Sequence, residues 1–223
     1  MGRQRQCAAG VMSTSGSDAM RRGFMVCFEG IDGAGKRTQT RLLAQKLRKA
    51  GMGVSTYSYP DYASEYGKII RRYLSGNMKL GRKEHFLLFL MDILKDTERI
   101  RKDLERGKIV VTDRYLYTAL AYICPSGLDY MEAKKFVGLF GLENPSLVFY
   151  LDMPVEMTAA RKLRHKKSLD KFEKNIGFLR DVKEVYGRMI KEGYGTRWIR
   201  IDATVPIANV SGSIFKEMAK HTD

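Results

Sequence analysis

Short apolar runs alternate with amphipathic segments along most of the chain. Runs bounded by Gly, Pro, Ser or Asp predict buried strands at residues 24–28, 54–59, 109–111, 146–151 and 198–201. Apolar residues that recur every three or four positions predict helices at residues 38–50, 65–74, 83–106, 115–123, 129–141, 155–164, 172–192 and 206–220. Strands that alternate with helices in this way predict an α/β fold, with a parallel sheet of about five strands and helices on both faces.

The segment after the first predicted strand carries the strongest chemical signal. Gly30, Gly33 and Gly35 open a loop that ends at Lys36, and a helical run follows. This order is typical of a phosphate-binding loop, in which backbone N–H groups and a helix N-terminus face the phosphates. The pattern G-x-x-x-x-G-K-[ST] fails only at its last position, where Arg37 replaces the residue whose hydroxyl binds Mg²⁺.

Polar residues also follow the other predicted strands. Asp61, the pair Asp113-Arg114, and Asp152 each come at or just after the end of an apolar run. Ligands of parallel α/β sheets bind outside the carboxyl ends of the strands. We therefore expect one site that joins these residues to the glycine loop.

Composition narrows the class of protein. The chain has 223 residues, and no apolar run approaches the roughly 18 residues that span a bilayer. The net charge is +15, of which residues 1–22 supply +3, so the remainder carries +12. A polyanionic ligand, nucleic acid or plain solvation would each suit such a surface. Three cysteines without C-x-x-C spacing favour a reducing interior over disulfides or a zinc site.

We expect one domain over residues 23–223, preceded by an extension over residues 1–22. The extension is rich in Gly, Ser and Arg and has no apolar core, so it does not resemble a secretory signal. We expect it to be disordered, or translation to start at Met12 or Met20.

Four motifs together resemble the thymidylate kinase family of P-loop nucleoside-monophosphate kinases. They read F-E-G-I-D-G-A-G-K, Y-P-D-Y-A-S-E-Y-G-K, V-T-D-R-Y-L-Y-T-A-L-A-Y and Y-L-D-M-P, and the similarity covers about residues 24–205. The resemblance implies a three-layer P-loop NTPase-type sandwich with a short basic lid. It also implies ATP-dependent phosphorylation of dTMP to dTDP with Mg²⁺, in a cytoplasmic homodimer. No membrane or nucleic acid partner is expected.

The resemblance also assigns roles to individual residues. The residues expected to bind ATP are Gly30, Ile31, Asp32, Gly33, Ala34, Gly35, Lys36, Arg37 and Thr38. The residues expected to bind the acceptor nucleotide are Asp32, Tyr62, Phe89, Arg114, Thr118 and Tyr122. The expected catalytic residues are Lys36, Asp113, Arg114, Arg161 and Arg164, with Asp113 also beside the metal. A guanidinium fork suits a phosphate monoester, and a carboxylate beside Mg²⁺ suits phosphoryl transfer.

Simpler interpretations remain open for some of these positions. Phe89 lies on an apolar helix face and could equally belong to the core. The basic segment 161–175 is the expected lid, whose cations would neutralise charge on the transferred phosphoryl group. A solvated basic helix face would give the same sequence.

Three positions depart from the family pattern. Arg37 replaces the Ser or Thr that binds Mg²⁺, so slow or altered catalysis is expected. Ile93 stands where an arginine usually reads the thymine O4 atom, and Tyr62 stands where some members carry an arginine. Two alternatives therefore stay open: a kinase for another deoxynucleoside monophosphate, and a catalytically weakened paralogue that binds nucleotides or nucleic acid.

Overall fold

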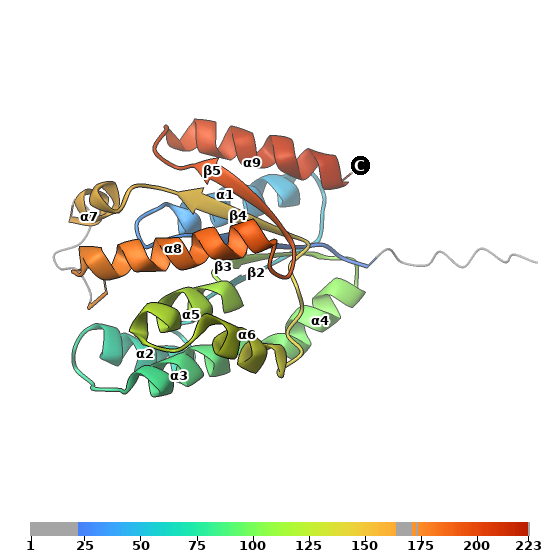
Figure 1. Cartoon of the computed structure of the whole chain (residues 1–223). Coiled ribbons are helices and arrows are strands. Elements are labelled where there is room, and N and C mark those ends of the chain that lie inside the picture. Colours follow the sequence, from blue (N-terminus) through green and yellow to red (C-terminus); the bar gives the residue numbers. More distant parts are fainter. Residues whose placement is uncertain (1–21, 164–170, 173, 223) are drawn as a thin grey trace, which may run out of the picture.

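The structure, a computed structural model, describes residues 22–163, 171, 172 and 174–222. Five strands and their helices follow one another in the order that the apolar pattern predicts (Figure 1). The elements are β1 (Met25–Glu29), α1 (Lys36–Lys49), β2 (Val54–Ser58), α2 (Glu65–Leu74), α3 (Arg82–Leu94), α4 (Thr97–Glu105), β3 (Ile109–Asp113), α5 (Leu116–Ile123), α6 (Tyr130–Gly138), β4 (Leu147–Asp152), α7 (Val155–Leu163), α8 (Ile176–Glu192), β5 (Arg197–Asp202) and α9 (Ile207–Thr222). A short 3₁₀ turn (Cys124–Ser126) follows α5.

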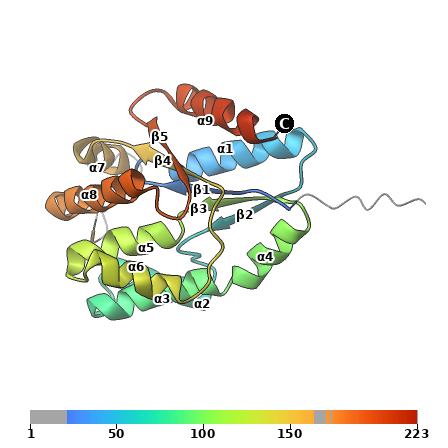
Figure 2. The ribbon, with the colours of Figure 1, turned by 45° about the vertical axis from the view of Figure 1, so that its right-hand side comes forward.

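The strands form one parallel sheet in the order β2-β3-β1-β4-β5. Helices α1 and α9 cover one face, and α3, α4, α5 and α8 cover the other (Figure 1, Figure 2). The predicted fold class is therefore confirmed. Because β1 is central, the loop that follows it lies in the middle of the carboxyl edge of the sheet.

The side chains of β1 alternate between the two faces of the sheet. Val26 and Phe28 pack in the core beneath α1 and α9, whereas Met25 and Cys27 pack in the core on the opposite side. Side chains of a strand point alternately to its two faces, so Glu29 belongs with Met25 and Cys27. A charged residue thus enters the core that α5 and α8 cover.

One predicted element is wrong. The single helix expected over residues 83–106 is two helices, α3 and α4, separated at Lys95 and Asp96. The Asp96 carboxylate accepts hydrogen bonds from Lys95 Nζ (2.7 Å) and from the Tyr59 hydroxyl (3.3 Å). These contacts draw Asp96 toward β2, and Asp96 becomes the residue that precedes α4. Helix α8 also begins at Ile176 rather than at 172, because the Asn175 side chain caps it.

Within the described part of the chain, no helix combines the length and hydropathy needed to cross a bilayer. Residues 1–21 and 164–170, which hold most of the expected extension and part of the expected lid, lie outside the described residues.

Candidate active site

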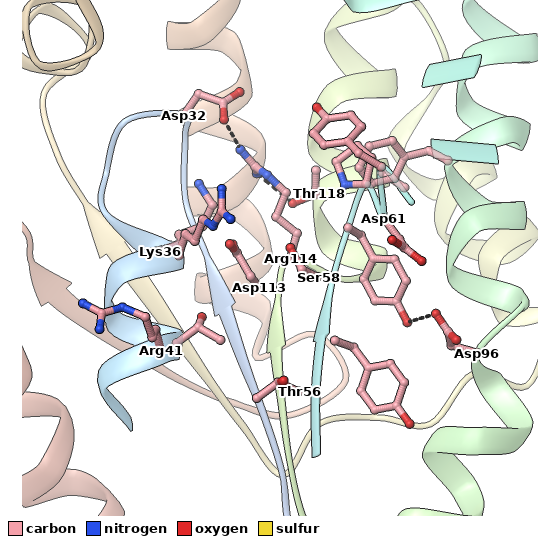
Figure 3. A pocket seen from close by; sticks show the side chains of 18 of the residues that line it. Asp32, Lys36, Arg41, Thr56, Ser58, Asp61, Asp96, Asp113, Arg114 and Thr118 are labelled. Atoms are coloured by element: carbon pink, nitrogen blue, oxygen red, sulfur yellow. Dashed lines mark hydrogen bonds and ion pairs between the residues drawn. The ribbon is translucent and has the colours of Figure 1, made fainter. Parts of the chain in front are cut away.

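A cavity of about 1160 Å³ opens at the carboxyl edge of the sheet, bounded by the glycine loop, the end of β2, and helices α1, α2, α3 and α5. Lys36, Asp113 and Arg114 lie on one side of it, and Asp61 lies across from them (Figure 3). The predicted site residues that line the cavity are Asp32, Gly33, Gly35, Lys36, Arg37, Thr38, Tyr62, Phe89, Asp113, Arg114, Thr118 and Tyr122. Gly30, Ile31 and Ala34 are the buried residues of the loop. Asp152, which was also expected in this site, does not line the cavity, and its carboxylate pairs with Lys183 and Arg200.

The glycine loop needs its glycines for both backbone conformation and space. Gly30 has φ +136°, and a Cβ there would lie 2.6 Å from the carbonyl oxygen of Leu151. Gly33 has φ +87°, and a Cβ there would lie 3.0 Å from the carbonyl oxygen of Thr158. The first turn of α1 contains no acidic residue. Its unpaired N–H groups therefore offer an anion site without a competing carboxylate.

Lys36 is a buried cation held against the loop. Its Nζ donates to the carbonyl oxygens of Gly30 and Ile31, at 2.9 Å each, and the residue is 5% exposed. Burial, and next the charge of Arg114, lowers the pKa of Lys36 from 10.5 to about 8. The ammonium group remains protonated at neutral pH but poorly solvated, a state that a phosphate would stabilise.

Arg114 is the most constrained side chain in the site. Its guanidinium donates from Nη2 to Asp32 Oδ1 (2.7 Å), and from Nη1 to the Gly30 carbonyl (3.1 Å) and Thr118 Oγ1 (3.0 Å). Arg114 is 7% exposed and has φ +69°, a left-handed conformation rare for a residue with a side chain. Such a conformation persists at functional sites when its surroundings hold it.

Asp113 has the character of a cation ligand. It is 9% exposed and lines the cavity, and among the described residues its carboxylate has no hydrogen bond or ion pair. Burial raises the pKa of Asp113, while Lys36, Arg114 and the nearby Arg37 act in the opposite direction. No group of three or more metal-ligating side chains occurs in the described chain. Mg²⁺ in phosphoryl-transfer sites uses one or two carboxylates together with substrate phosphates, so Asp113 fits that donor set.

The part of the cavity that α3 and α5 line is aromatic. Tyr122 donates to Asp32 Oδ2 (3.2 Å), and its ring meets that of Phe172 edge to face, with centroids 5.4 Å apart. Phe89 and His85 lie one helical turn apart on α3, with ring centroids 6.0 Å apart. Such a compartment suits a planar heterocycle joined to an anion held by Arg114.

Arg71 and His85 also line this region, although the sequence patterns did not predict them as site residues. Arg71 packs over the Tyr62 ring, 4.6 Å from its centroid, and His85 stacks on Tyr73 at 4.6 Å. Burial, and then the charge of Lys171, lowers the pKa of His85 to about 4, so it is neutral. In the sequence, the one sign that His85 lines the cavity is its position one helical turn before Phe89.

The predicted departures from the family pattern have different structural outcomes. Ile93 is fully buried and does not line the cavity. Arg37 is exposed and lines it, beside Asp113. Arg161 lies near the end of α7 and is not in the described wall of the cavity, and Arg164 lies outside the described residues.

Comparison with known proteins agrees with this geometry. The family model described as thymidylate kinase matches residues 28–214. The "Probable thymidylate kinase" of Methanocaldococcus jannaschii is 37% identical over 81% of this chain and 87% of its own length. The thymidylate kinase of Plasmodium falciparum is 30% identical over 92% and 93%.

A solved structure extends the similarity to the fold. The thymidylate kinase of Candida albicans superposes with a TM-score of 0.74, at 22% identity, over 90% of this chain and 92% of that one. The family model covers most of the chain and includes the loop, Asp113-Arg114 and Tyr122. This chain therefore belongs to the thymidylate kinase family.

Proposed function

We propose that this protein transfers the γ-phosphoryl group of ATP to dTMP, giving ADP and dTDP. The main support for the proposal is that a single cavity adjoins both the glycine loop and the aromatic compartment. One wall is the glycine loop with Lys36, and the other is the aromatic compartment, with Asp32 and Arg114 between them. A donor triphosphate and an acceptor monophosphate can therefore meet within one cavity.

The residues act mainly by positioning and by balancing charge. A monophosphate is largely dianionic at neutral pH, so its attacking oxygen needs no strong general base. Lys36 and the N–H groups of α1 would bind the donor phosphates, and Arg114 would bind the acceptor phosphate. Asp113 would hold Mg²⁺, which when bound neutralises charge on the phosphates. Asp32 connects the glycine loop to the acceptor side of the cavity, because its carboxylate accepts hydrogen bonds from both Arg114 and Tyr122.

The lid arginines are part of the same proposal. Arg161, near the end of α7, and Arg164 would bring positive charge to the transferred phosphoryl group. Replacing Arg161 or Arg164 with Ala should then lower kcat more than it raises the KM for ATP. If both Ala variants keep the native kcat, neither lid arginine takes part in the reaction.

A coupled assay of ADP release tests the reaction and its acceptor. We expect dTMP to be the best substrate among dTMP, dUMP, dCMP, dGMP and dAMP, with turnover that requires Mg²⁺. A clear preference for a base other than thymine would assign the enzyme to another deoxynucleotide. Ile93 is the reason to test other bases, because it is buried and its side chain has no hydrogen-bond donor for the base. No ADP release, together with salt-dependent binding to DNA, would favour a weakened paralogue.

A homodimer and a cytoplasmic location complete the proposal. Leu87 and Met91 lie one turn apart on α3 and are 42% and 45% exposed, so they form an uncovered apolar strip. We propose that a second copy packs on this strip. Sedimentation should give a dimer for the native chain and a monomer for Met91→Glu. A native chain that sediments as a monomer would contradict this interface.

A further inference from the structure

Glu29 is a carboxylate buried in the core beside the site. It is the last residue of β1, is 0% exposed, and faces the side of the sheet covered by α5 and α8. Burial raises the pKa of Glu29, whereas Arg114, Thr118 and Tyr186 lower it. Burying a carboxylate is costly unless donors surround it. The donors around Glu29 therefore indicate what the residue is for.

Three N–H and O–H donors converge on the carboxylate from two separate segments, and the weaker Cys27 thiol donor lies 3.7 Å from Oε1. Oε1 accepts from the backbone N–H of Tyr115 (2.9 Å). Oε2 accepts from Thr118 Oγ1 (2.6 Å) and from the Tyr186 hydroxyl (2.7 Å). Tyr115 and Thr118 belong to the start of α5, and Tyr186 belongs to α8. Glu29 thus joins β1 to both of the helices above it.

These bonds fix the backbone of Arg114 from both sides. The Arg114 N–H donates to the carbonyl oxygen of Phe28 (2.9 Å), and the next N–H, of Tyr115, donates to Glu29. The left-handed conformation of Arg114 is unfavourable for a residue with a side chain, so it needs such support. Consecutive residues of β1 supply that support.

The same carboxylate also reaches the guanidinium of Arg114. Nη1 of Arg114 donates to Thr118 Oγ1 (3.0 Å), and the Thr118 hydroxyl donates its own proton to Glu29. The Thr118 oxygen is therefore oriented with its lone pairs toward the arginine. Glu29 controls Arg114 at its backbone directly and at its side chain through Thr118.

We propose that Glu29 is the positioning residue of the acceptor-phosphate site, with Tyr186 of α8 as its support. This inference deepens the proposed function and rests on it. Removing the support leaves Arg114 in place but misdirected, and a misplacement near 1 Å can cost about 100-fold in rate. The lost interaction is with the phosphate of the acceptor and not with its base or sugar.

The comparison of dTMP with thymidine tests this role, because the two ligands differ only in the phosphate. The variant is Tyr186→Phe, which removes one donor to Glu29 and keeps the ring. We expect its affinity for dTMP to fall about 3- to 10-fold, the usual effect of one buried hydrogen bond, with the affinity for thymidine unchanged. Glu29→Gln should lower dTMP affinity further, because one side of the amide is an NH2 donor that must face either the Tyr115 N–H or the Thr118 and Tyr186 hydroxyls.

Tyr117→Phe is the matched control. Tyr117 is also fully buried on α5, but its hydroxyl has no hydrogen-bond partner in the described chain. Both affinities should therefore stay at their native values in this variant.

Titration calorimetry gives both affinities without turnover, so the result does not depend on the rate of phosphoryl transfer. Equal losses for dTMP and thymidine in Tyr186→Phe would assign the network to the fold alone and overturn the proposal, as would an unchanged dTMP affinity. If Glu29→Gln does not fold, Tyr186→Phe still decides. A native chain that binds dTMP more tightly than thymidine yet forms no ADP would contradict the proposed reaction while leaving the positioning role standing.

Discussion

The buried ammonium group of Lys36 should make the nucleotide-free protein less stable at neutral pH than at alkaline pH. Its pKa is lowered from 10.5 to about 8, first by burial and then by Arg114. The unfolded chain therefore binds this proton more tightly than the folded chain does. The resulting penalty is complete below pH 8 and disappears as the pH rises toward 10.5. Between pH 7 and pH 10 the change amounts to about 2 to 3 kcal/mol.

Lys36→Met isolates this effect, because the variant carries no proton at position 36 in either state. The free energy of unfolding is measured in urea at pH 7 and pH 10, without phosphate or nucleotide. The stability of Lys36→Met relative to the native protein should be about 2 to 3 kcal/mol greater at pH 7 than at pH 10. Other titrating groups, and the lost packing of the lysine, are the same in both comparisons and cancel.

Lys36→Arg serves as the control, since its guanidinium stays charged throughout this range. Its stability relative to Lys36→Met should not depend on pH. Both variants should lose phosphoryl transfer. If Lys36→Met and the native protein keep the same stability difference at both pH values, the lysine is not desolvated as the structure indicates, and the reasoning fails.

Three further substitutions test the rest of the site. Gly33→Ala should lose about 1–3 kcal/mol of stability in urea unfolding and bind ATP more weakly, whereas Gly138→Ala, which meets no atom within 4 Å, should do neither. Asp113→Asn should lower kcat at least ~100-fold yet raise the Tm, because burial raises the pKa of this carboxyl and its charge opposes folding at neutral pH. Arg37→Ser should raise turnover at low Mg²⁺ in the ADP assay, because it restores the hydroxyl that binds Mg²⁺ in the usual pattern. Unchanged turnover would show that Arg37 does not limit the rate.

The sheet and most helices could be predicted because their signals are local. The strands β1, β3 and β4 are short, mainly apolar runs, and α2 begins and ends where predicted because Ser64 caps it and Gly76 follows it. The glycine loop and Asp113-Arg114 were found for the same reason. Parallel strands end at one edge of the sheet, so residues that follow them are brought together.

The signals that failed are the ones that depend on distant parts of the chain. The apolar periodicity continues through Lys95 and Asp96, so the break between α3 and α4 appears only once Tyr59 bonds Asp96. Glu29 is visible as a charge at the end of an apolar strand. Its role depends on Tyr186, which lies 157 residues away in sequence. The burial of Ile93 likewise follows from how α3 packs, which periodicity alone does not give.

The central place of β1 in the sheet has a consequence for synthesis on the ribosome. Both neighbours of β1 come much later in the chain, since β3 is Ile109–Asp113 and β4 is Leu147–Asp152. At about 5–20 residues per second, roughly 6 to 25 s separate the synthesis of Glu29 from that of Asp152. Until β3 has been made, the apolar residues of β1 have no neighbouring strand to pair with, and the second neighbour, β4, comes only at the end of this interval. The glycine loop that follows β1 is thus made long before the strands that fix its final position.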